Sequence, residues 1–279
     1  MQIAIISGKG GTGKTTIAVG LGEVIKNSIK IDCDVDASNM NLFYQGKVIR
    51  QEKFYSGKTA VINQDLCLKC NRCLEHCKFD AINNYVINDL KCEGCLVCKL
   101  VCPSLAITFK DNYIADIYLK RLKNGRLIKA KMKIGAAGSG KLITALRSKI
   151  MDSQVITIID ASPGLGCPVI ASLTNVDLAL IVTEPTLSAF KDLKRLVLLT
   201  KKLKVKTVVS INKYNLNLKI TKKIKDYCQK NNLELLSLIP YDQLVLKSIQ
   251  ELKPIVTYQD SLAGLEIKKL AQKLILLKE

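Results

Sequence analysis

The sequence predicts an α/β fold, in which a mostly parallel sheet is covered by helices on both faces and interrupted by a small inserted α+β domain. Apolar, β-branched runs at residues 155–159, 178–182 and 207–211 are typical of buried parallel strands. Helical patterns at about 187–203 and 217–230 alternate with these strands. A cysteine-dense, duplicated segment at residues 61–109 breaks the pattern, so the larger domain is expected to comprise residues 1–60 and 110–279.

The composition favours a cytoplasmic protein that binds metal. Hydrophobic residues make up 48% of the 279 residues, which is enough for a core that needs no disulfides. No apolar run reaches the length of a membrane span, and the first strand runs directly into a glycine-rich loop instead of an export signal. Eight of the eleven cysteines lie in two clustered runs, which indicates metal ligands and leaves only Cys33, Cys167 and Cys228 over.

The net charge is strongly positive, at +19, but the basic residues are dispersed. Lysine provides 37 of the 43 basic residues, and these lysines occur along the whole chain, as expected for solvated helix faces. We therefore do not expect nucleic acid as a partner, although an acidic protein partner stays open.

A phosphate-binding loop follows the first predicted strand, at about residues 2–6. The run Gly8-Lys9-Gly10-Gly11-Thr12-Gly13-Lys14-Thr15 contains the pattern Gly-x4-Gly-Lys-Thr and opens a predicted helix that extends to about Ile25. Glycines allow backbone N–H groups to converge on phosphate oxygens, and the helix N-terminus adds a favourable dipole. In this context Lys14 is expected to neutralise the β- and γ-phosphates of ATP, and the Thr15 hydroxyl to complete the coordination of Mg²⁺.

Aspartates follow two further predicted strands. Residues 29–31 form a short apolar run that ends at Asp32, in the segment Asp32-Cys33-Asp34-Val35-Asp36. Asp160 ends the run at 155–159 and leads into Ala161-Ser162-Pro163-Gly164-Leu165-Gly166-Cys167-Pro168. The carboxyl ends of parallel strands share one edge of a sheet, so Asp160 is expected to bind Mg²⁺ through water while the glycine-rich segment rearranges on hydrolysis.

The run from Lys9 to Thr16 resembles the deviant phosphate loop of the MinD/ParA/Mrp and nitrogenase-iron-protein ATPases, a group of P-loop NTPases. The resemblance implies an ATP-dependent homodimer in which Lys9 reaches the nucleotide of the partner subunit. It also implies that Asp34, with Asp36 as the second choice, orients the attacking water, and that Asn212 contacts the adenine. The residues expected around the nucleotide are Gly8, Gly10, Gly11, Thr12, Gly13, Lys14, Thr15, Thr16 and Asn212. The family usually has Asp-Gly-Pro-Pro-Gly at residues 160–164, and Ala161 and Ser162 depart from that pattern.

A second glycine-rich run at residues 135–141 is not expected to bind ATP. Leu142 takes the place of the required hydroxyl residue, and the alternating charges of residues 129–133 give no convincing buried strand before the run. The family's ferredoxin-bearing members share the segment Ser139-Gly140-Lys141, whose role the sequence does not explain.

The two cysteine runs have the spacing of iron–sulfur ligands. Cysteines at 67, 70, 73 and 77 recur 25 residues later at 92, 95, 98 and 102, and Ala81-Ile82 recurs as Ala106-Ile107. In such runs the fourth cysteine ligates the other cluster. One [4Fe–4S] cluster is therefore expected on Cys67, Cys70, Cys73 and Cys102, and a second on Cys92, Cys95, Cys98 and Cys77. Zinc, the alternative, generally uses two separated Cys-x2-Cys pairs.

Residues 61–109 resemble a bacterial two-cluster ferredoxin. Lys78 departs from that pattern, because the second run has Pro103 at the matching place. His76, the only histidine, is expected to be a surface residue and not a ligand.

The apolar stripe at 262, 265, 270, 274 and 277 is expected to pack on the protein's own core, although some MinD-type ATPases bind membranes through such a helix.

The leading hypothesis is an Mg²⁺-dependent ATPase that couples ATP binding and hydrolysis to electron transfer through two [4Fe–4S] clusters. We expect Lys9, Lys14 and Asp34 to act in catalysis, Thr15 and Asp160 to hold Mg²⁺, and a redox or cluster-acceptor protein to be the partner. An ATP-dependent iron–sulfur assembly or carrier protein is the alternative. A ParA-like DNA-partition protein is a third possibility, suggested only by the charge.

Overall fold

The computed structural model describes residues 1–136, 138–150 and 154–278. The chain divides into two compact units. Unit 1 comprises Met1–Glu52, Ile117–Lys131 and Ser139–Glu279, and unit 2 comprises Lys53–Asp116 and Met132–Gly138. The phosphate-loop sequence therefore lies in unit 1, and both cysteine runs lie in unit 2.

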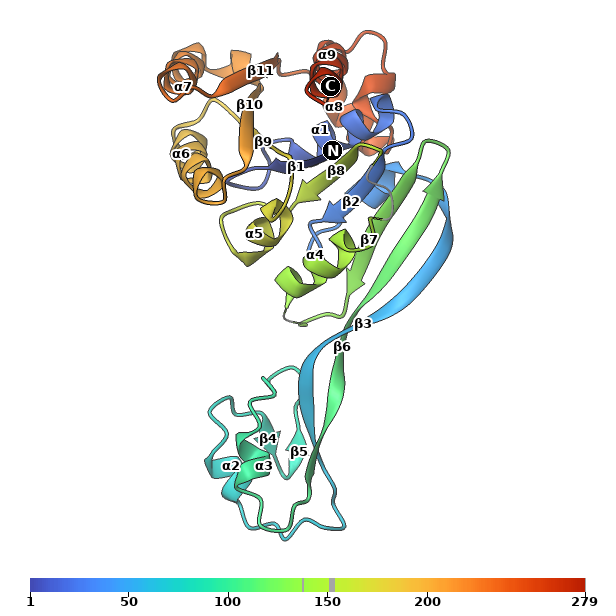
Figure 1. The fold of residues 1–279 in the computed structure, drawn as a ribbon, viewed down its shortest axis with the longest axis vertical. Helices are drawn as coiled ribbons and strands as arrows, with labels where there is room; N and C mark the ends of the chain where they lie inside the picture. The colour runs from blue at the N-terminus through green and yellow to red at the C-terminus, as the bar shows by residue number, and fades with distance from the viewer. Residues whose placement is uncertain (137, 151–153, 279) are drawn as a thin grey trace. The chain divides into compact units, whose positions relative to one another are not determined.

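A nine-stranded sheet has the order β11-β10-β9-β1-β8-β2-β7-β6-β3 (Figure 1). The six neighbouring pairs from β11–β10 through β2–β7 are parallel, which confirms the predicted mostly parallel sheet. These strands are β1 (Gln2–Ile6), β2 (Ile29–Cys33), β7 (Arg126–Met132), β8 (Thr157–Ala161), β9 (Leu178–Thr183), β10 (Lys206–Asn212) and β11 (Glu234–Ile239).

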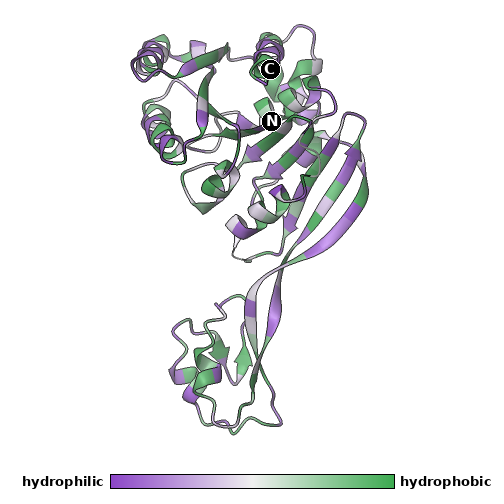
Figure 2. Cartoon of the chain, viewed as in Figure 1, coloured by the Kyte–Doolittle hydropathy of each residue, from purple (hydrophilic) through white to green (hydrophobic). Residues whose placement is uncertain are grey.

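Helices cover both faces of the sheet, as predicted. On one face α1 (Lys14–Val24), α8 (Leu244–Gln250) and α9 (Leu262–Leu276) pack over a core that includes Ile3 and Leu180. On the other lie α4 (Ser139–Arg147), α5 (Cys167–Leu173), α6 (Leu187–Lys202) and α7 (Leu218–Lys230). Figure 2 shows the central strands as largely hydrophobic, whereas the helices carry hydrophilic residues on one side. Short 3-10 turns occur at η1 (Met40–Phe43), η2 (Tyr214–Leu216) and η3 (Ile255–Thr257).

The C-terminal helix α9 packs on the core of unit 1, as predicted, but through a different stripe of residues. The buried positions are Ala263, Gly264, Ile267, Leu270, Ala271 and Leu274. Leu262 and Leu265 were expected in the stripe, yet they are 62% and 43% exposed, because they project from the other side of the helix. None of the helices in the described part of the chain combines the length and apolar character of a membrane span.

The expectation that no buried strand precedes the second glycine-rich run was wrong. β7 (Arg126–Met132) ends shortly before this run and pairs in parallel with β2. Leu127, Ile128 and Ala130 are buried, while Lys131 and Arg126 face solvent. Lys129 and Lys131 share one side of the strand, where only Leu127 is buried, so the alternating lysines mark a partly exposed strand and not the absence of a strand.

Two long strands continue from unit 1 into unit 2. β3 (Gly46–Ile62) and β6 (Ile107–Leu122) are neighbours in the sheet. They run in opposite directions, because Gly46 lies beside Arg121 at one end and the Asn63 N–H donates to the Ala106 carbonyl, at 2.8 Å, at the other.

Unit 2 repeats its backbone conformation every 25 residues. The short helices α2 (Arg72–Glu75) and α3 (Val97–Leu100) have this offset, and β4 (Ile82–Asn83) pairs with β5 (Val86–Ile87). Left-handed backbone angles recur at the same offset, in the pairs Lys69 and Gly94, Asn71 and Leu96, and Asp80 and Leu105. The duplication of the sequence is thus a duplication of local structure.

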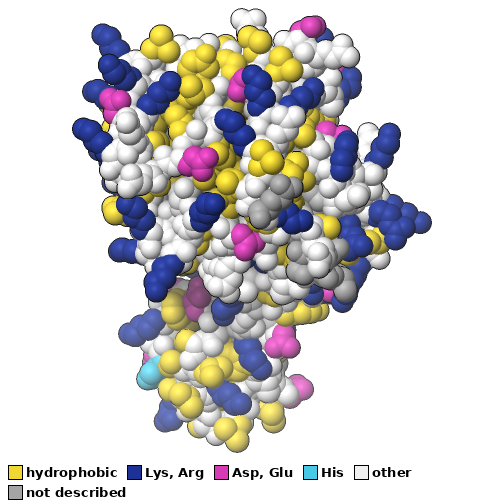
Figure 3. Space-filling model, turned by 45° about the horizontal axis from the view of Figure 1, so that its top comes forward, with side chains coloured by type: hydrophobic (Ala, Val, Ile, Leu, Met, Phe, Trp, Pro, Cys, Tyr) yellow, Lys and Arg dark blue, Asp and Glu magenta, His cyan; other side chains and the backbone are white. Residues whose placement is uncertain are grey.

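Lys and Arg side chains are spread over the face of the molecule drawn in Figure 3 and do not form a single patch.

None of the eleven cysteines, which all belong to the described residues, forms a disulfide.

Candidate functional site

Five neighbouring parallel strands of unit 1 each deliver one part of a candidate nucleotide site. In the order β10, β9, β1, β8 and β2, their carboxyl ends lead to Asn212, Glu184, the phosphate loop, Asp160 and the segment from Asp32 to Asp36. Because the strands are parallel, these groups meet at one edge of the sheet. The structure thus brings the predicted nucleotide-site residues together.

The phosphate loop needs glycine at residue 13. Gly13 precedes α1 with a φ of +85°, in the left-handed region that glycine tolerates. A Cβ atom at this position would lie 2.2 Å from Asn212 Nδ2. By contrast, Cβ atoms at Gly10 and Gly11 would meet nothing within 4 Å, so that part of the loop borders open space. A polyphosphate can approach the backbone there.

Lys14 and Asp160 form a buried ion pair. The Lys14 ammonium donates to Asp160 Oδ1, and the two side chains are 6% and 1% exposed. The other carboxylate oxygen, Asp160 Oδ2, is buried without a hydrogen-bond partner among the described residues, and so is Thr12 Oγ1. Buried polar atoms without partners are rare in proteins, so these two oxygens fit a site that a ligand completes. Thr15 directly follows Lys14 in the first turn of α1, and its side chain is partly exposed.

Asp32 holds the segment that contains Asp34. Asp32 is in register with Asp160 on the neighbouring strand, and its Oδ2 accepts hydrogen bonds from Ser38 Oγ at 2.7 Å and from the Met40 N–H at 3.2 Å. Burial, reinforced by Asp160, raises the pKa of Asp32. Asp34 is half-buried, and burial raises its pKa as well, although Lys14 opposes this. Asp36 is exposed.

The departure from the family pattern at Ser162 has a structural explanation. Its hydroxyl donates to the Cys33 carbonyl at 2.9 Å and so links the segment after β8 to the one after β2. Nearby, Gly164 has a φ of +102°, and its N–H donates to the Ser7 carbonyl at 2.9 Å. The glycine-rich segment that was expected to rearrange on hydrolysis is thus tied to the segment after β2 and to Ser7, which directly precedes the phosphate loop.

Glu184 is a site residue that the sequence did not reveal. Its Oε1 lies 2.8 Å from Lys9 Nζ, and its Oε2 lies 3.2 Å from Lys213 Nζ. Burial opposes its ionisation, but hydrogen bonds from both lysines outweigh this and lower the pKa of Glu184. The signal that could have found it is the position of Glu184 directly after a buried strand, at the same edge as Asp160.

The predicted adenine residue, Asn212, contacts the phosphate loop. Its Nδ2 donates to the Thr12 carbonyl at 2.8 Å, and its Oδ1 accepts from the Lys213 N–H at 3.0 Å. Lys213 Nζ donates to the Gly11 carbonyl at 3.1 Å. These two residues therefore support the loop from the end of β10.

The second glycine-rich run is not part of this arrangement. Ser139, Gly140 and Lys141 form the first turn of α4, which packs against α5, and Gly140 lies beside Cys167. Ala137, within the run, lies outside the described residues.

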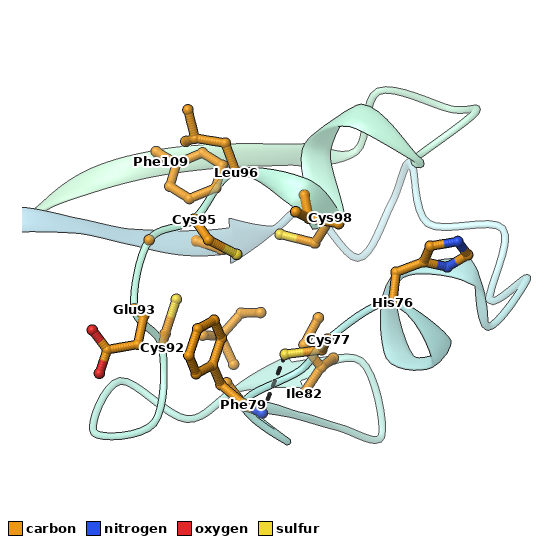
Figure 4. Close-up of a pocket in the computed structure, with 15 residues that line it drawn as sticks. His76, Cys77, Phe79, Ile82, Cys92, Glu93, Cys95, Leu96, Cys98 and Phe109 are labelled. Atoms are coloured by element: carbon orange, nitrogen blue, oxygen red, sulfur yellow. Dashed lines mark hydrogen bonds between the residues drawn. The ribbon is translucent and has the colours of Figure 1, made fainter.

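In unit 2, the eight clustered cysteines line two hollows, four in each, and these two groups are the predicted ligand sets. One hollow is lined by Cys67, Cys70, Cys73 and Cys102, among other residues. The other is lined by Cys77, Cys92, Cys95 and Cys98. Figure 4 shows the four sulfur atoms of the second set turned toward a common space, with His76 pointing away from it. Each hollow takes its fourth cysteine from the other repeat.

The chemistry of both donor sets suits a [4Fe–4S] cluster. Four thiols surround each space, and the rest of the lining is largely apolar, including Ile62 and Ile107 in the first hollow and Phe79 and Phe109 in the second. Sulfur atoms also receive hydrogen bonds: Cys77 Sγ accepts from the Ala81 N–H at 3.4 Å. Within the described residues, no group of three or more histidine, cysteine, aspartate or glutamate side chains is arranged to hold a single metal ion.

Comparison with known proteins identifies the family. Residues 3–255 match the family described as "CobQ/CobB/MinD/ParA nucleotide binding domain". The chain belongs to this family. An uncharacterized protein of Methanocaldococcus jannaschii is 35% identical over 224 residues, which are 78% of this chain and 79% of the relative.

Two further comparisons concern the fold and the cysteine segment. A structure of the septum site-determining protein MinD from Pyrococcus horikoshii, complexed with Mg-ADP, superposes with a TM-score of 0.62 at 20% identity, covering 99% of this chain and 96% of that one. An uncharacterized polyferredoxin-like protein of M. jannaschii is 35% identical over 98 residues, which are 35% of this chain and 46% of the relative. The first comparison establishes the P-loop α/β fold of this family for the chain.

Proposed function

We propose that this chain is an Mg²⁺-dependent ATPase whose ATP cycle is coupled to electron transfer through two [4Fe–4S] clusters. The observation that carries the proposal is the presence, in one chain, of a phosphate loop with a buried Lys14–Asp160 pair and of two four-cysteine hollows. Membership of a nucleotide-binding family supports the first half. The partial likeness to a polyferredoxin-like protein supports the second.

At the nucleotide, the protein's contribution is positioning and charge. The backbone of the phosphate loop and Lys14 hold the β- and γ-phosphates, while Thr15 and the unpartnered Asp160 Oδ2 serve Mg²⁺, directly or through water. Bound Mg²⁺ neutralises charge that develops on the phosphate oxygens. Asp34, which is half-buried and interacts electrostatically with Lys14, orients the attacking water. Asn212 supports the loop through the Thr12 carbonyl and borders the adenine.

Lys9 supplies the link to dimerisation. In this chain Glu184 holds Lys9 beside its own phosphate loop, and Thr186 and Ser188 are within 3.5 Å of its ammonium. In the ATP-bound homodimer Lys9 leaves Glu184 and pairs with the phosphates of the partner subunit. Nucleotide binding therefore changes which negative charge Lys9 contacts.

In unit 2, each cysteine set holds one cluster, and a bound cluster stores one electron. Cys67, Cys70, Cys73 and Cys102 hold the first centre, and Cys92, Cys95, Cys98 and Cys77 hold the second. Exchange of the fourth cysteine joins the two repeats, so cluster binding stabilises the whole unit. The partner is a redox protein that delivers or accepts electrons, and the place of action is the cytoplasm.

Metal analysis and ATP hydrolysis together test this proposal. Anaerobically purified full-length protein should contain about eight iron and eight labile sulfide atoms per chain, as two four-iron clusters require. It should hydrolyse ATP only with Mg²⁺, and Lys14→Ala should abolish hydrolysis while leaving the iron content unchanged. Zinc in place of iron would refute the iron–sulfur part of the proposal, and hydrolysis that survives Lys14→Ala would refute the ATPase part.

The second candidate is an ATP-dependent carrier that assembles or delivers iron–sulfur clusters. Exposure of Cys70 and Cys95, one in each ligand set, favours it, because a cluster that leaves must be reached by an acceptor's thiols. Rapid, stoichiometric transfer of iron and sulfide to an apo-ferredoxin would support this function over stable electron carrying.

A further inference from the structure

The two cysteine hollows differ in charge although their sequences repeat. Two cationic side chains, Lys69 and Arg72, line the hollow of Cys67, Cys70, Cys73 and Cys102, hereafter the first hollow. In the second hollow, Gly94 and Val97 occupy the matching positions 25 residues later. The second hollow is instead lined by Glu93, whose counterpart in the first hollow is Leu68. Among lysine, arginine and acidic side chains, the lining thus changes from two positive groups to one negative group. His76 also lines the second hollow, but its ring points away from the sulfur atoms (Figure 4).

The side chains that can hydrogen-bond to sulfur differ in the same direction. Ser104 lines the first hollow, with its Oγ 3.6 Å from Cys102 Sγ, whereas its counterpart in the second hollow is Phe79. Phe79 and Phe109 border the sulfurs of the second hollow, and Glu93 lies at its rim with the carboxylate directed outward (Figure 4). Apolar side chains make up a larger share of the residues that line the second hollow than of those that line the first.

We propose that the two centres have different reduction potentials, and that the first hollow holds the centre that is reduced first. This inference rests on the proposed function, since it requires both clusters. One-electron reduction adds one negative charge to a [4Fe–4S] centre, with the electron supplied by a low-potential one-electron donor and no proton taken up. Nearby cations and hydrogen bonds to sulfur favour the more negative, reduced state, while a nearby carboxylate and an apolar lining disfavour it. Lys69, Arg72 and Ser104 act in the first direction, and Glu93, Phe79 and Phe109 act in the second.

Lys99, which follows Cys98, lines neither hollow, and the same holds for two other lysines next to ligand cysteines. Lys78 follows Cys77, and Lys91 precedes Cys92, but both are exposed and neither lines a hollow. Their charges are therefore not among those that border the sulfurs. Lys69 and Arg72 are also exposed, but they border the first hollow itself.

The repeat provides matched substitutions for the test, because each residue can be replaced by its own counterpart. In the first hollow, Lys69→Gly and Arg72→Val remove the cations. Glycine suits residue 69, where the backbone φ is +51°. In the second hollow, Glu93→Leu removes the carboxylate and Val97→Arg adds a cation. Gly94→Lys is unsuitable, because its Cβ would lie 2.2 Å from the Lys58 carbonyl oxygen.

The experiment is an anaerobic redox titration of the full-length, cluster-loaded protein with dithionite, followed by electron paramagnetic resonance. We expect two midpoints, with one isolated paramagnet at half reduction and magnetic coupling between two centres at full reduction. Lys69→Gly and Arg72→Val should lower only the higher midpoint, and Glu93→Leu and Val97→Arg should raise only the lower one. Lys133→Gln, an exposed charge change that lines neither hollow, should move neither midpoint.

Each outcome bears on a different claim. Two loaded clusters with one shared midpoint would overturn the ordering alone, and so would a Lys69→Gly variant that shifts the lower midpoint. Absence of iron and labile sulfide would overturn the proposed function and the ordering together.

Discussion

The ammonium of Lys9 lies 2.8 Å from the Oε1 atom of Glu184 in the same chain. Glu184 also pairs with Lys213, which donates to the Gly11 carbonyl of the phosphate loop. One carboxylate therefore restrains two cations beside the place where a triphosphate is proposed to bind. This arrangement opposes the role proposed for Lys9 in a partner subunit until nucleotide competes with Glu184.

Replacing Glu184 with Gln should favour the ATP-dependent dimer. The amide keeps the size of the side chain but loses the charge that holds Lys9, so dimers should form at several-fold lower protein concentration with a non-hydrolysable ATP analogue. Analytical ultracentrifugation measures this directly. Lys9→Ala should give monomers under the same conditions, and a Lys9→Ala protein that dimerises like the wild type would show that Lys9 does not act in trans.

Breaking the Lys14–Asp160 pair should destabilise the nucleotide-free protein. Lys14→Met leaves the Asp160 carboxylate buried without its cation, which typically costs about 3–5 kcal/mol. In the double variant Lys14→Met/Asp160→Asn, the free energy of unfolding should recover part of this loss, because no unpaired charge remains. Urea unfolding of the single and double variants gives the coupling energy, and additive effects of the two substitutions would contradict a paired role.

Gly13→Ala should damage the phosphate loop in two separable ways. Alanine disfavours the φ of +85°, and its Cβ collides with Asn212 Nδ2. Adding Asn212→Ala should relieve only the collision, so nucleotide affinity should stay low in the double variant. Gly10→Ala, where the added Cβ meets nothing within 4 Å, is the matched control for the free energy of unfolding. Calorimetric titration with ADP and Mg²⁺, together with urea unfolding, distinguishes these cases.

Lys30 should make the stability of unit 1 depend on pH. Its side chain is fully buried, donates to the carbonyls of Ser28 and Asn124, and has its pKa lowered by burial to about 8. In the unfolded chain its pKa is about 10.4, so between these values the unfolded state binds more protons and the free energy of unfolding rises with pH. At pH 7 the lysine is charged in both states, and this gain is absent.

The test for Lys30 compares slopes. Between pH 8 and 10, the free energy of unfolding of the wild type should gain up to about 3 kcal/mol relative to that of Lys30→Met. The two plots against pH should therefore not be parallel. Lys47→Met, at an exposed position, should run parallel to the wild type. Parallel curves for Lys30→Met as well would show that Lys30 titrates as it does in water.

The parts of the site that were predicted from sequence are those with local signals. The phosphate loop, Asp160 and the buried strands around them are set by residue types within a few positions of each other, and the structure places them as expected. Glu184 was missed because its role depends on Lys9 and Lys213, which are far from it in the chain. β7 was missed because a half-exposed strand with alternating lysines lacks the continuous apolar run of a central strand.

The most direct test of the central claim is an anaerobic redox titration of the full-length, cluster-loaded protein with and without MgATP, with Lys14→Ala as the control. Our account predicts that MgATP shifts a midpoint potential or the paramagnetic line shape of the clusters, and that Lys14→Ala, with the same iron content, shows no shift. Identical titrations of the wild type with and without MgATP would contradict the coupling of the ATP cycle to the cluster potentials.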